Sequence, residues 1–313
     1  MNTNQYCFTP QWSTIDEAMA VNDFVEEGLL AGELMLVSLD VKGAFDAAWW
    51  LSILNGLKAR GCPKILYNLT KSYFSQRTAI LSTNSVRMQR EVSKGCPEGS
   101  CCGPGFLNNQ YNSLLNLKFT RRTKALAFAN DLILAIRRET VSEVGNCSKL
   151  ELSKITAWSK NNKITFNEDK SKIMLISRRK RKEVKEIKIY LHNKPSEQVK
   201  TMKYLGKIID NKLKFSEYIS YAAESWPKLI HCLFKLANVS WRLKHEALKT
   251  IYKGAILPLL LYGAPVWYEA MTYEYNKLKY IRVQTYENKN SQRISNNVKR
   301  STVYPGRNDS YYY

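Results

Sequence analysis

The sequence predicts an α+β fold in which helices and strands are mixed rather than strictly repeated. Short β-prone apolar runs, such as residues 34–39, end at polar turns. Stretches with the apolar spacing of a helix follow them, for example residues 140–161. Residues 164–210 alternate short strands with basic loops, and we find no internal repeat. Together these patterns favour a sheet that packs against helices.

The first of these elements is the run LMLVSL, residues 34–39, which predicts a strand that ends at Asp40. The stretch AAWWLSILNGLKARG after it has helical spacing and closes on a glycine. Residues 77–92 predict two strands around a Thr-Asn-Ser turn. Asp40 is therefore expected where a strand gives way to a turn.

The middle of the chain predicts a loop, a helix and a hairpin. The Gly- and Pro-rich residues 95–105 should form a loop that opens into the helical stretch FLNNQYNSLLNL. In ALAFANDLILAI, residues 125–136, two apolar runs flank one polar pair, which predicts a tight hairpin whose turn carries Asn130 and Asp131. Residues 244–261 look helical, and the tail 285–313 lacks apolar periodicity and is expected to be disordered.

Composition limits the class of protein. A chain of 313 residues that is 44% apolar can bury a sizeable core, and its length suggests about two domains. Its 48 Lys and Arg outnumber its 27 Asp and Glu, which gives a net charge of +21. That excess favours a polyanionic partner such as nucleic acid or an anionic membrane surface, with a soluble basic protein as the alternative.

Cysteine and histidine usage favours an intracellular protein. The seven cysteines include no CxxC pair and the chain has only three histidines, so neither a disulfide framework nor a zinc site is predicted. The longest apolar stretch, residues 255–267, is too short to span a bilayer and holds two prolines. The N-terminus lacks the pattern of a signal peptide. We therefore expect a protein that is not secreted and has no membrane partner.

Acidic residues at a strand end and at a hairpin tip suggest chemistry on phosphates. Phosphoryl transfer needs divalent metal held by hard oxygen ligands, and two carboxylates from different strands can hold two ions about 4 Å apart. Asp40 and the pair at 130 and 131 have the placement for this. An ordinary hairpin turn remains the alternative on local grounds.

Five ordered stretches carry a resemblance to a known family: SLDVKGAFDAAWW, GCPEGSCCGPGFLNNQYNSLL, AFANDLILAI, WSKNNKITFNEDKSKIM and KYLGKIIDNKLKF. Their order resembles that of the reverse transcriptases of non-LTR retrotransposons, the LINE-like elements of the insect jockey and related groups. The resemblance implies a right-hand polymerase with a palm built on an antiparallel sheet. It divides the chain into partial fingers (1–30), a palm with inserted fingers elements (31–215), a helical thumb or connection (216–284) and a tail (285–313).

The resemblance also implies roles for individual residues. The metal and catalytic site would consist of Asp40 and Asp131, with Asn130 as a weak ligand, holding Mg²⁺ or Mn²⁺. The nucleotide site would comprise Phe45, which rejects a ribose 2′-OH by bulk, together with Gly95, Pro97, Glu98, Gly99 and Lys170. Primer and template would meet Tyr204, Leu205, Gly206, Arg178, Arg179 and Arg181. The implied activity is transfer of a dNTP to a DNA primer on an RNA template.

Several of these residues have alternative interpretations. The basic run RRKRK, residues 178–182, could contact phosphates, act as a nuclear localisation signal or form a solvated loop. Localisation could thus be cytoplasmic, nuclear or both. Lys170 could simply be solvated, and Phe45 could be a core aromatic. The glycine loop could be a turn whose Ser100 caps the next helix.

The chain departs from the family at its centre. Asn130 stands where the family has the first aspartate of an Asp-Asp pair, and an amide offers a neutral oxygen where Mg²⁺ prefers an anionic one. Glu98 replaces a Gln, Cys7 a Gly, and Trp12 a basic residue. Two functions therefore stay open: an RNA-directed DNA polymerase, or a truncated, catalytically weak or inactive remnant that only binds nucleic acid.

Overall fold

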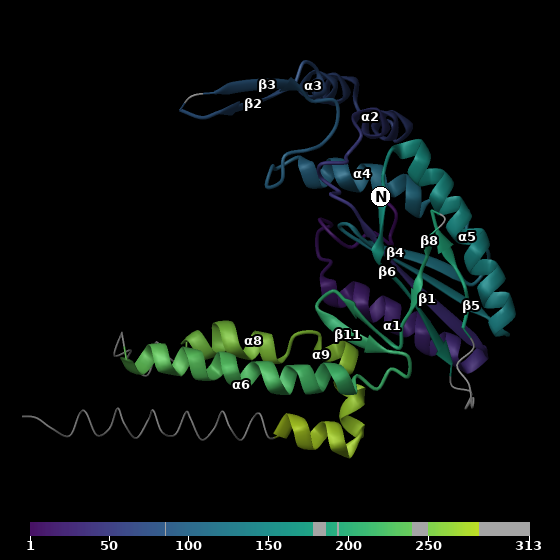
Figure 1. Cartoon of the computed structure of the whole chain (residues 1–313), viewed down its shortest axis with the longest axis vertical. Coiled ribbons are helices and arrows are strands. Elements are labelled where there is room, and N and C mark those ends of the chain that lie inside the picture. Colours follow the sequence, from purple (N-terminus) through teal and green to yellow (C-terminus); the bar gives the residue numbers. More distant parts are fainter. Residues whose placement is uncertain (85, 178–185, 193, 240–249, 282–313) are drawn as a thin grey trace, which may run out of the picture. The chain divides into compact units, whose positions relative to one another are not determined.

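The computed structural model describes residues 1–84, 86–177, 186–192, 194–239 and 250–281. The chain divides into two compact units, Met1–Gly206 and Lys207–Tyr313 (Figure 1). The division falls directly after Leu205 and Gly206, which follow strand β10 (Thr201–Tyr204) and precede strand β11 (Lys207–Asp210). None of the helices in the described ranges is long and apolar enough to cross a membrane.

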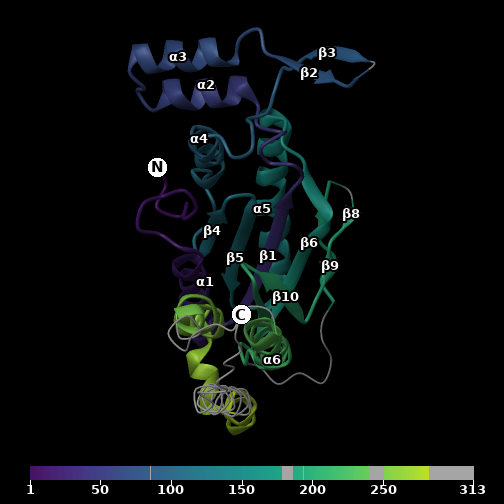
Figure 2. The ribbon, with the colours of Figure 1, turned by 90° about the vertical axis from the view of Figure 1, so that its left-hand side faces the viewer.

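A five-stranded sheet forms the centre of the first unit (Figure 2). Its order is β4 (Thr123–Phe128), β5 (Asp131–Arg138), β1 (Glu33–Val41), β6 (Phe166–Ser177) and β9 (Glu197–Gln198). All neighbouring pairs are antiparallel except β6 and β9. This arrangement confirms the predicted α+β class with a largely antiparallel sheet.

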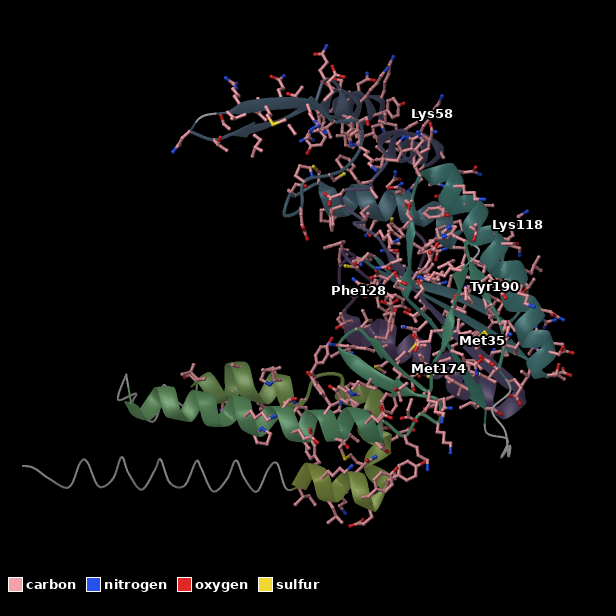
Figure 3. All side chains as sticks on the ribbon, in the orientation of Figure 1. Met35, Lys58, Lys118, Phe128, Met174 and Tyr190 are labelled. Atoms are coloured by element: carbon pink, nitrogen blue, oxygen red, sulfur yellow. The ribbon has the colours of Figure 1, made fainter. Side chains whose placement is uncertain are left out.

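Helices cover the two faces of this sheet. Every second side chain of β1, from Met35 to Val41, enters a core with α4 (Gly103–Leu115) and α5 (Val141–Asn162). On the other face lies α1 (Thr14–Ala31), where Gly28 comes close to the side chains of Leu34 and Arg137. Figure 3 labels Met35 in β1, Met174 in β6 and Phe128 at the end of β4. Alternating side chains of β1 thus point to opposite faces of the sheet, one covered by α4 and α5 and the other by α1.

An N-terminal segment pairs with the edge strand β4. The amide of Ala127 donates to the carbonyl of Asn4 at 3.0 Å, and the amide of Tyr6 donates to the carbonyl of Ala127 at 3.1 Å. Between them Gln5 forms a parallel bridge to Ala127. The buried side chain of Gln5 also donates to Asn108 of α4 at 2.8 Å. The segment therefore continues the sheet beyond β4 and is fixed to a neighbouring helix.

The remaining elements of the first unit form two small groups. Helices α2 (Trp50–Ala59) and α3 (Lys64–Phe74) contact one another, with the rings of Trp50 and Phe74 stacked at 5.2 Å. Next to them in sequence, β2 (Thr78–Ser82) and β3 (Arg87–Glu91) form the predicted hairpin, and all residues of these two strands are exposed. A second short hairpin consists of β7 (Tyr190–Leu191) and β8 (Lys194–Pro195).

The described residues of the second unit after 215 are mainly helical, as predicted. They contain α6 (Ser216–Val239), a π-helical turn (Tyr252–Ile256), α8 (Leu257–Leu260), α9 (Ala264–Trp267) and a 3₁₀ turn (Tyr268–Thr272). The Tyr218 hydroxyl donates to the carbonyl of Tyr262 at 3.1 Å, and the ring of Trp267 packs against Tyr218. The expected disordered tail, 285–313, lies outside the described residues, and the domain boundaries stay predictions.

Three local expectations change in the structure. The helix after β1 begins at Trp50 rather than Ala47, and α4 begins at Gly103, inside the stretch predicted as a loop. Residues 166–177 form one strand of 12 residues instead of several short ones. Its length follows from its partner, because β6 pairs with β1 along almost all of β1.

Candidate active site

Asp40 and Asp131 lie directly opposite each other on neighbouring antiparallel strands, as the sequence predicts. Side chains that are directly opposite have Cβ atoms about 4.5–5.5 Å apart and point to the same face. Their neighbours Leu39 and Leu132 point to the other face and are buried in the core with α4 and α5. Hydrophobic alternation along both strands therefore directs the two carboxylates to one face of the sheet.

The tight hairpin turn lies one residue earlier than expected, so that it carries Asn130 but not Asp131. The turn consists of Ala129 and Asn130 alone, because Phe128 already pairs with Asp131, which begins β5. Ala129 has a φ of 53°, a left-handed conformation that is uncommon for a residue with a Cβ. Asn130 is half-buried and immediately precedes the carboxylate of Asp131. Its role as a third metal ligand stays a prediction.

The two carboxylates repel each other. Burial and, after it, the negative charge of Asp40 raise the pKa of Asp131, while the charge of Lys170 opposes this shift. The Lys170 ammonium is 3.9 Å from the Asp40 carboxylate. Its side chain is 70% exposed, so the attraction is screened by solvent. Burial and the charge of Asp40 together outweigh the effect of Lys170 on the pKa of Asp131.

Tyr111 of α4 belongs to the same electrostatic environment. The side chain is buried, and its hydroxyl has no hydrogen-bond partner in the described part of the chain. Burial raises the pKa of Tyr111 most, and the charges of Asp40 and Asp131 raise it further. The sequence shows only a tyrosine in a helical apolar stripe, so this residue was not predicted. From the sequence alone, Tyr111 cannot be distinguished from an ordinary aromatic residue of the core.

The loop 95–100 is attached to the segment after β1. The amide of Gly95 donates to the carbonyl of Ala48 at 2.7 Å, and the amide of Cys96 donates to the carbonyl of Phe45 at 2.8 Å. Gly95 has a φ of 95°, and a Cβ there would lie 3.2 Å from the backbone oxygen of Asp46. Only glycine fits this close backbone approach. The structure thus brings Phe45 and Gly95 together.

The other residues of this loop are placed as follows. Pro97 and Glu98 are exposed, and Gly99 has a φ of 78°. The Ser100 hydroxyl accepts from the amide of Gly103, the first residue of α4, at 3.1 Å, but the N-cap position itself is Cys102, which makes no side-chain cap bond. The role of Glu98 in nucleotide binding stays a prediction.

The residues predicted to meet primer and template are spread over different surroundings. Tyr204 is buried, and its hydroxyl donates to Glu17 of α1 at 2.6 Å. This side chain therefore connects β10 to α1. Leu205 and Gly206 have positive φ values of 46° and 74°, as a two-residue turn requires. The arginines of the basic run, Arg178, Arg179 and Arg181, lie outside the described residues.

Comparison with known proteins identifies the family. Residues 1–209 match the family described as reverse transcriptase (RNA-dependent DNA polymerase). The chain belongs to this family. Asp40, Asp131 and the elements of the first unit lie within the matched region, which confirms the resemblance read from the motifs.

Relatives come from insect retrotransposable elements. The chain is 28% identical over 231 residues to the putative 115 kDa protein of the type-1 element R1DM of Drosophila melanogaster, covering 74% of this chain and 22% of that protein. It is 26% identical over 280 residues to the Pol polyprotein of element R1 of Bradysia coprophila, covering 90% and 28%. The jockey polymerase of Drosophila melanogaster is 24% identical over 294 residues, covering 90% and 31%. The chain thus spans less than a third of these relatives.

Among solved structures, apo telomerase from Candida tropicalis truncated from its C-terminal domain is 10% identical and has a TM-score of 0.48. That comparison covers 66% of this chain and 39% of the telomerase. Telomerase from Candida albicans with a fragment of telomeric RNA has a TM-score of 0.46 at 11% identity, covering 93% of this chain and 50% of that one.

The raised pKa of Asp131 gives a stability prediction. A carboxylate whose pKa is raised in the folded state destabilises that state when ionised, and this penalty disappears as the pH falls below the folded-state pKa. Asp131→Asn should therefore increase the free energy of unfolding at pH 7 without metal, by up to about 1 kcal/mol, the size of a cross-strand charge pair. The gain should shrink as the pH is lowered toward the range where Asp131 is protonated.

Urea unfolding in EDTA at a series of pH values measures this effect. Glu98→Gln is the matched control, because it removes the charge of an exposed carboxylate. If Asp131→Asn unfolded more easily than the wild type at pH 7, the carboxylate would have a stabilising partner and the repulsion argument would be wrong.

Proposed function

We propose that this chain catalyses RNA-directed DNA synthesis on an RNA template. In this reaction the 3′-hydroxyl of a DNA primer attacks the α-phosphate of a dNTP, a phosphodiester bond forms and pyrophosphate is released. The observation that carries the proposal is the direct cross-strand pairing of Asp40 with Asp131 in a chain of the reverse transcriptase family. Nucleotidyl transfer depends on charge stabilisation at the phosphates more than on covalent chemistry by protein groups. Two carboxylates on one face of a sheet provide the required anionic centre.

The donor set supports a divalent metal. The carboxylates of Asp40 and Asp131 would hold Mg²⁺ or Mn²⁺, with the amide oxygen of Asn130 as a neutral third ligand. The raised pKa of Asp131 supports this fit, because a cation between the two acids would relieve their repulsion. Within the described ranges no group of three His, Cys, Asp or Glu residues is arranged to hold a metal. When bound, the metal supplies electrostatic stabilisation of charge on the phosphate oxygens.

Other residues have distinct roles in the proposal. The half-buried ring of Phe45 would lie under the sugar of the incoming nucleotide and exclude a 2′-OH. The exposed ammonium of Lys170, near Asp40, would attract the triphosphate. The loop with Gly95, Pro97, Glu98 and Gly99 would approach the nucleotide by its backbone, since it is attached beside Phe45. Leu205 and Gly206 would support the primer.

The partners would be an RNA template, a DNA primer and dNTPs, attracted by the charge of +21. We propose an intracellular location, in the cytoplasm, the nucleus or both. A second function is favoured by one observation, the neutral Asn130 at the hairpin tip. In this second function the chain is a remnant that binds nucleic acid but does not catalyse nucleotide transfer.

Primer extension on an RNA template, with Mg²⁺ and with Mn²⁺, tests the proposal. Asp40→Asn is expected to lower dNTP incorporation by about 10²–10³-fold or more, the usual effect of removing one preorganised electrostatic group. The control is Asp23→Asn, which removes an exposed carboxylate of α1. Equal incorporation by wild type and Asp40→Asn would contradict the assigned site. Tight binding of primer and template without incorporation in either metal would favour the binding-only function.

A further inference from the structure

Phe8 combines two unusual features. It is an aromatic residue whose side chain is 51% exposed, and its backbone has a φ of 53°. A bulky residue in this left-handed region is a conformational outlier, since its Cβ crowds the following carbonyl oxygen. Single exposed apolar side chains are common, so exposure alone would carry no argument. The strain requires that the surrounding structure hold this residue in place.

The residues on both sides of Phe8 supply that support. Cys7 is buried, and its backbone carbonyl accepts from the side-chain amide of Asn108, in α4, at 2.8 Å. The hydroxyl of Thr9 donates to the carbonyl of Gln5 at 3.1 Å. Gln5 itself bridges to Ala127 and donates to Asn108. These hydrogen bonds fix Cys7 and Thr9, and the Phe8 ring between them is exposed to solvent.

The outward ring lies next to Phe45. The two ring centroids are 6.5 Å apart, and the planes meet at 75°, an edge-to-face arrangement. Phe45 is only five residues beyond Asp40, and Ala127, to which the Phe8 segment is bonded, is two residues before Ala129 of the hairpin turn. Phe8 therefore places a second ring beside Phe45, on a segment that is bonded to the strand leading into the hairpin turn.

We propose that Phe8 is a stacking surface for a nucleobase beside Phe45. The inference rests on the proposed function, because that function brings bases to this site. An apolar ring offers no donor to a phosphate, whereas every base has a π-face that can stack on it. The base belongs either to the incoming nucleotide or to the template, and the chemistry of recognition is the same for both.

Photocrosslinking separates these two sources. One arm uses the wild-type protein with 5-iodo-dUTP, and the other uses an RNA template carrying 5-iodouridine at the position to be copied. Irradiation joins the iodinated base to an aromatic ring in contact with it, and mass spectrometry locates the adduct. We expect an adduct on Phe8 in one of the two arms. Adducts that map only elsewhere, or none in either arm, would overturn the proposal.

Affinity measurements provide the second test. Phe8→Leu keeps an apolar side chain but removes the π-face, and should weaken binding of the crosslinking partner about tenfold. Phe8→Tyr keeps the ring and should bind as the wild type does. Trp12→Leu is the matched control, because Trp12 is 49% exposed on the same segment but packs on Tyr6 instead. Unchanged binding by folded Phe8→Leu would overturn the proposal.

These measurements do not depend on catalysis. Crosslinking at Phe8 by a protein that extends no primer would reject the polymerase activity and keep the stacking surface. Extension that is lost in Asp40→Asn but unaffected by Phe8→Leu, with no adduct at Phe8, would keep the polymerase and reject the stacking surface.

Discussion

Asn130→Asp is expected to raise Mg²⁺-dependent dNTP incorporation by orders of magnitude. The substitution adds a negative charge at the hairpin tip, next to the paired carboxylates of Asp40 and Asp131. Metal stabilisation of phosphate charge lowers the barrier by several kcal/mol, and an anionic ligand holds Mg²⁺ better than an amide does. The measurement is primer extension on an RNA template by wild type and variant, with circular dichroism to show that both are folded.

Asp40→Asn in the Asn130→Asp protein is the control and should abolish the gain. Equal activity of the folded wild type and Asn130→Asp would mean that Asn130 is an adequate ligand or that the defect lies elsewhere. If all three folded proteins were inactive, the cause would lie outside the metal site, and the binding-only function would be favoured.

Affinity for primer and template is expected to fall by about 10³-fold or more between 50 and 200 mM salt, and to depend little on sequence. The reason is counterion release by a protein with a charge of +21 that contacts several phosphates. Reversing the charges of Arg178, Arg179 and Arg181 to Glu should flatten the slope of log affinity against log salt by about 2–3, if each arginine contacts one phosphate.

A matched triple variant tests whether the location of these charges matters. Arg121→Glu, Lys149→Glu and Lys160→Glu change the net charge equally at exposed positions, two of them on α5, which covers the face of the sheet opposite the carboxylates. This control should lower affinity only slightly. The same slope in both triple variants and the wild type would identify the basic run as a solvated loop.

The sheet and its carboxylates could be predicted because they depend on local patterns. Apolar runs that end at polar residues predicted β1, β4 and β5. The strands β4 and β5 are neighbours because they form a hairpin. The pairing of Asp40 with Asp131 then followed from the family resemblance, since one sequence does not show which strands are neighbours. A capping box at Ser13 and Asp16 marks the start of α1, yet no helix was predicted there.

Other features depend on contacts that one sequence does not contain. The left-handed backbone of Phe8 arises from bonds made by Cys7 and Gln5 to distant segments. The unpartnered hydroxyl of Tyr111 is set by what surrounds it in the core. Tyr204 was predicted to meet the primer because its motif resembles a family hairpin, but the structure gives its hydroxyl a buried partner on α1.

The two-residue turn of Ala129 and Asn130 restricts how this hairpin can change in length. Because side chains alternate between faces, one residue inserted ahead of Asp131 would send its carboxylate into the core beside α4 and α5. Two inserted residues would preserve its direction. An exchange such as asparagine for aspartate at 130 leaves this parity untouched. The difference between asparagine and aspartate at 130 is therefore chemical rather than geometric, and a change in a single codon exchanges one for the other.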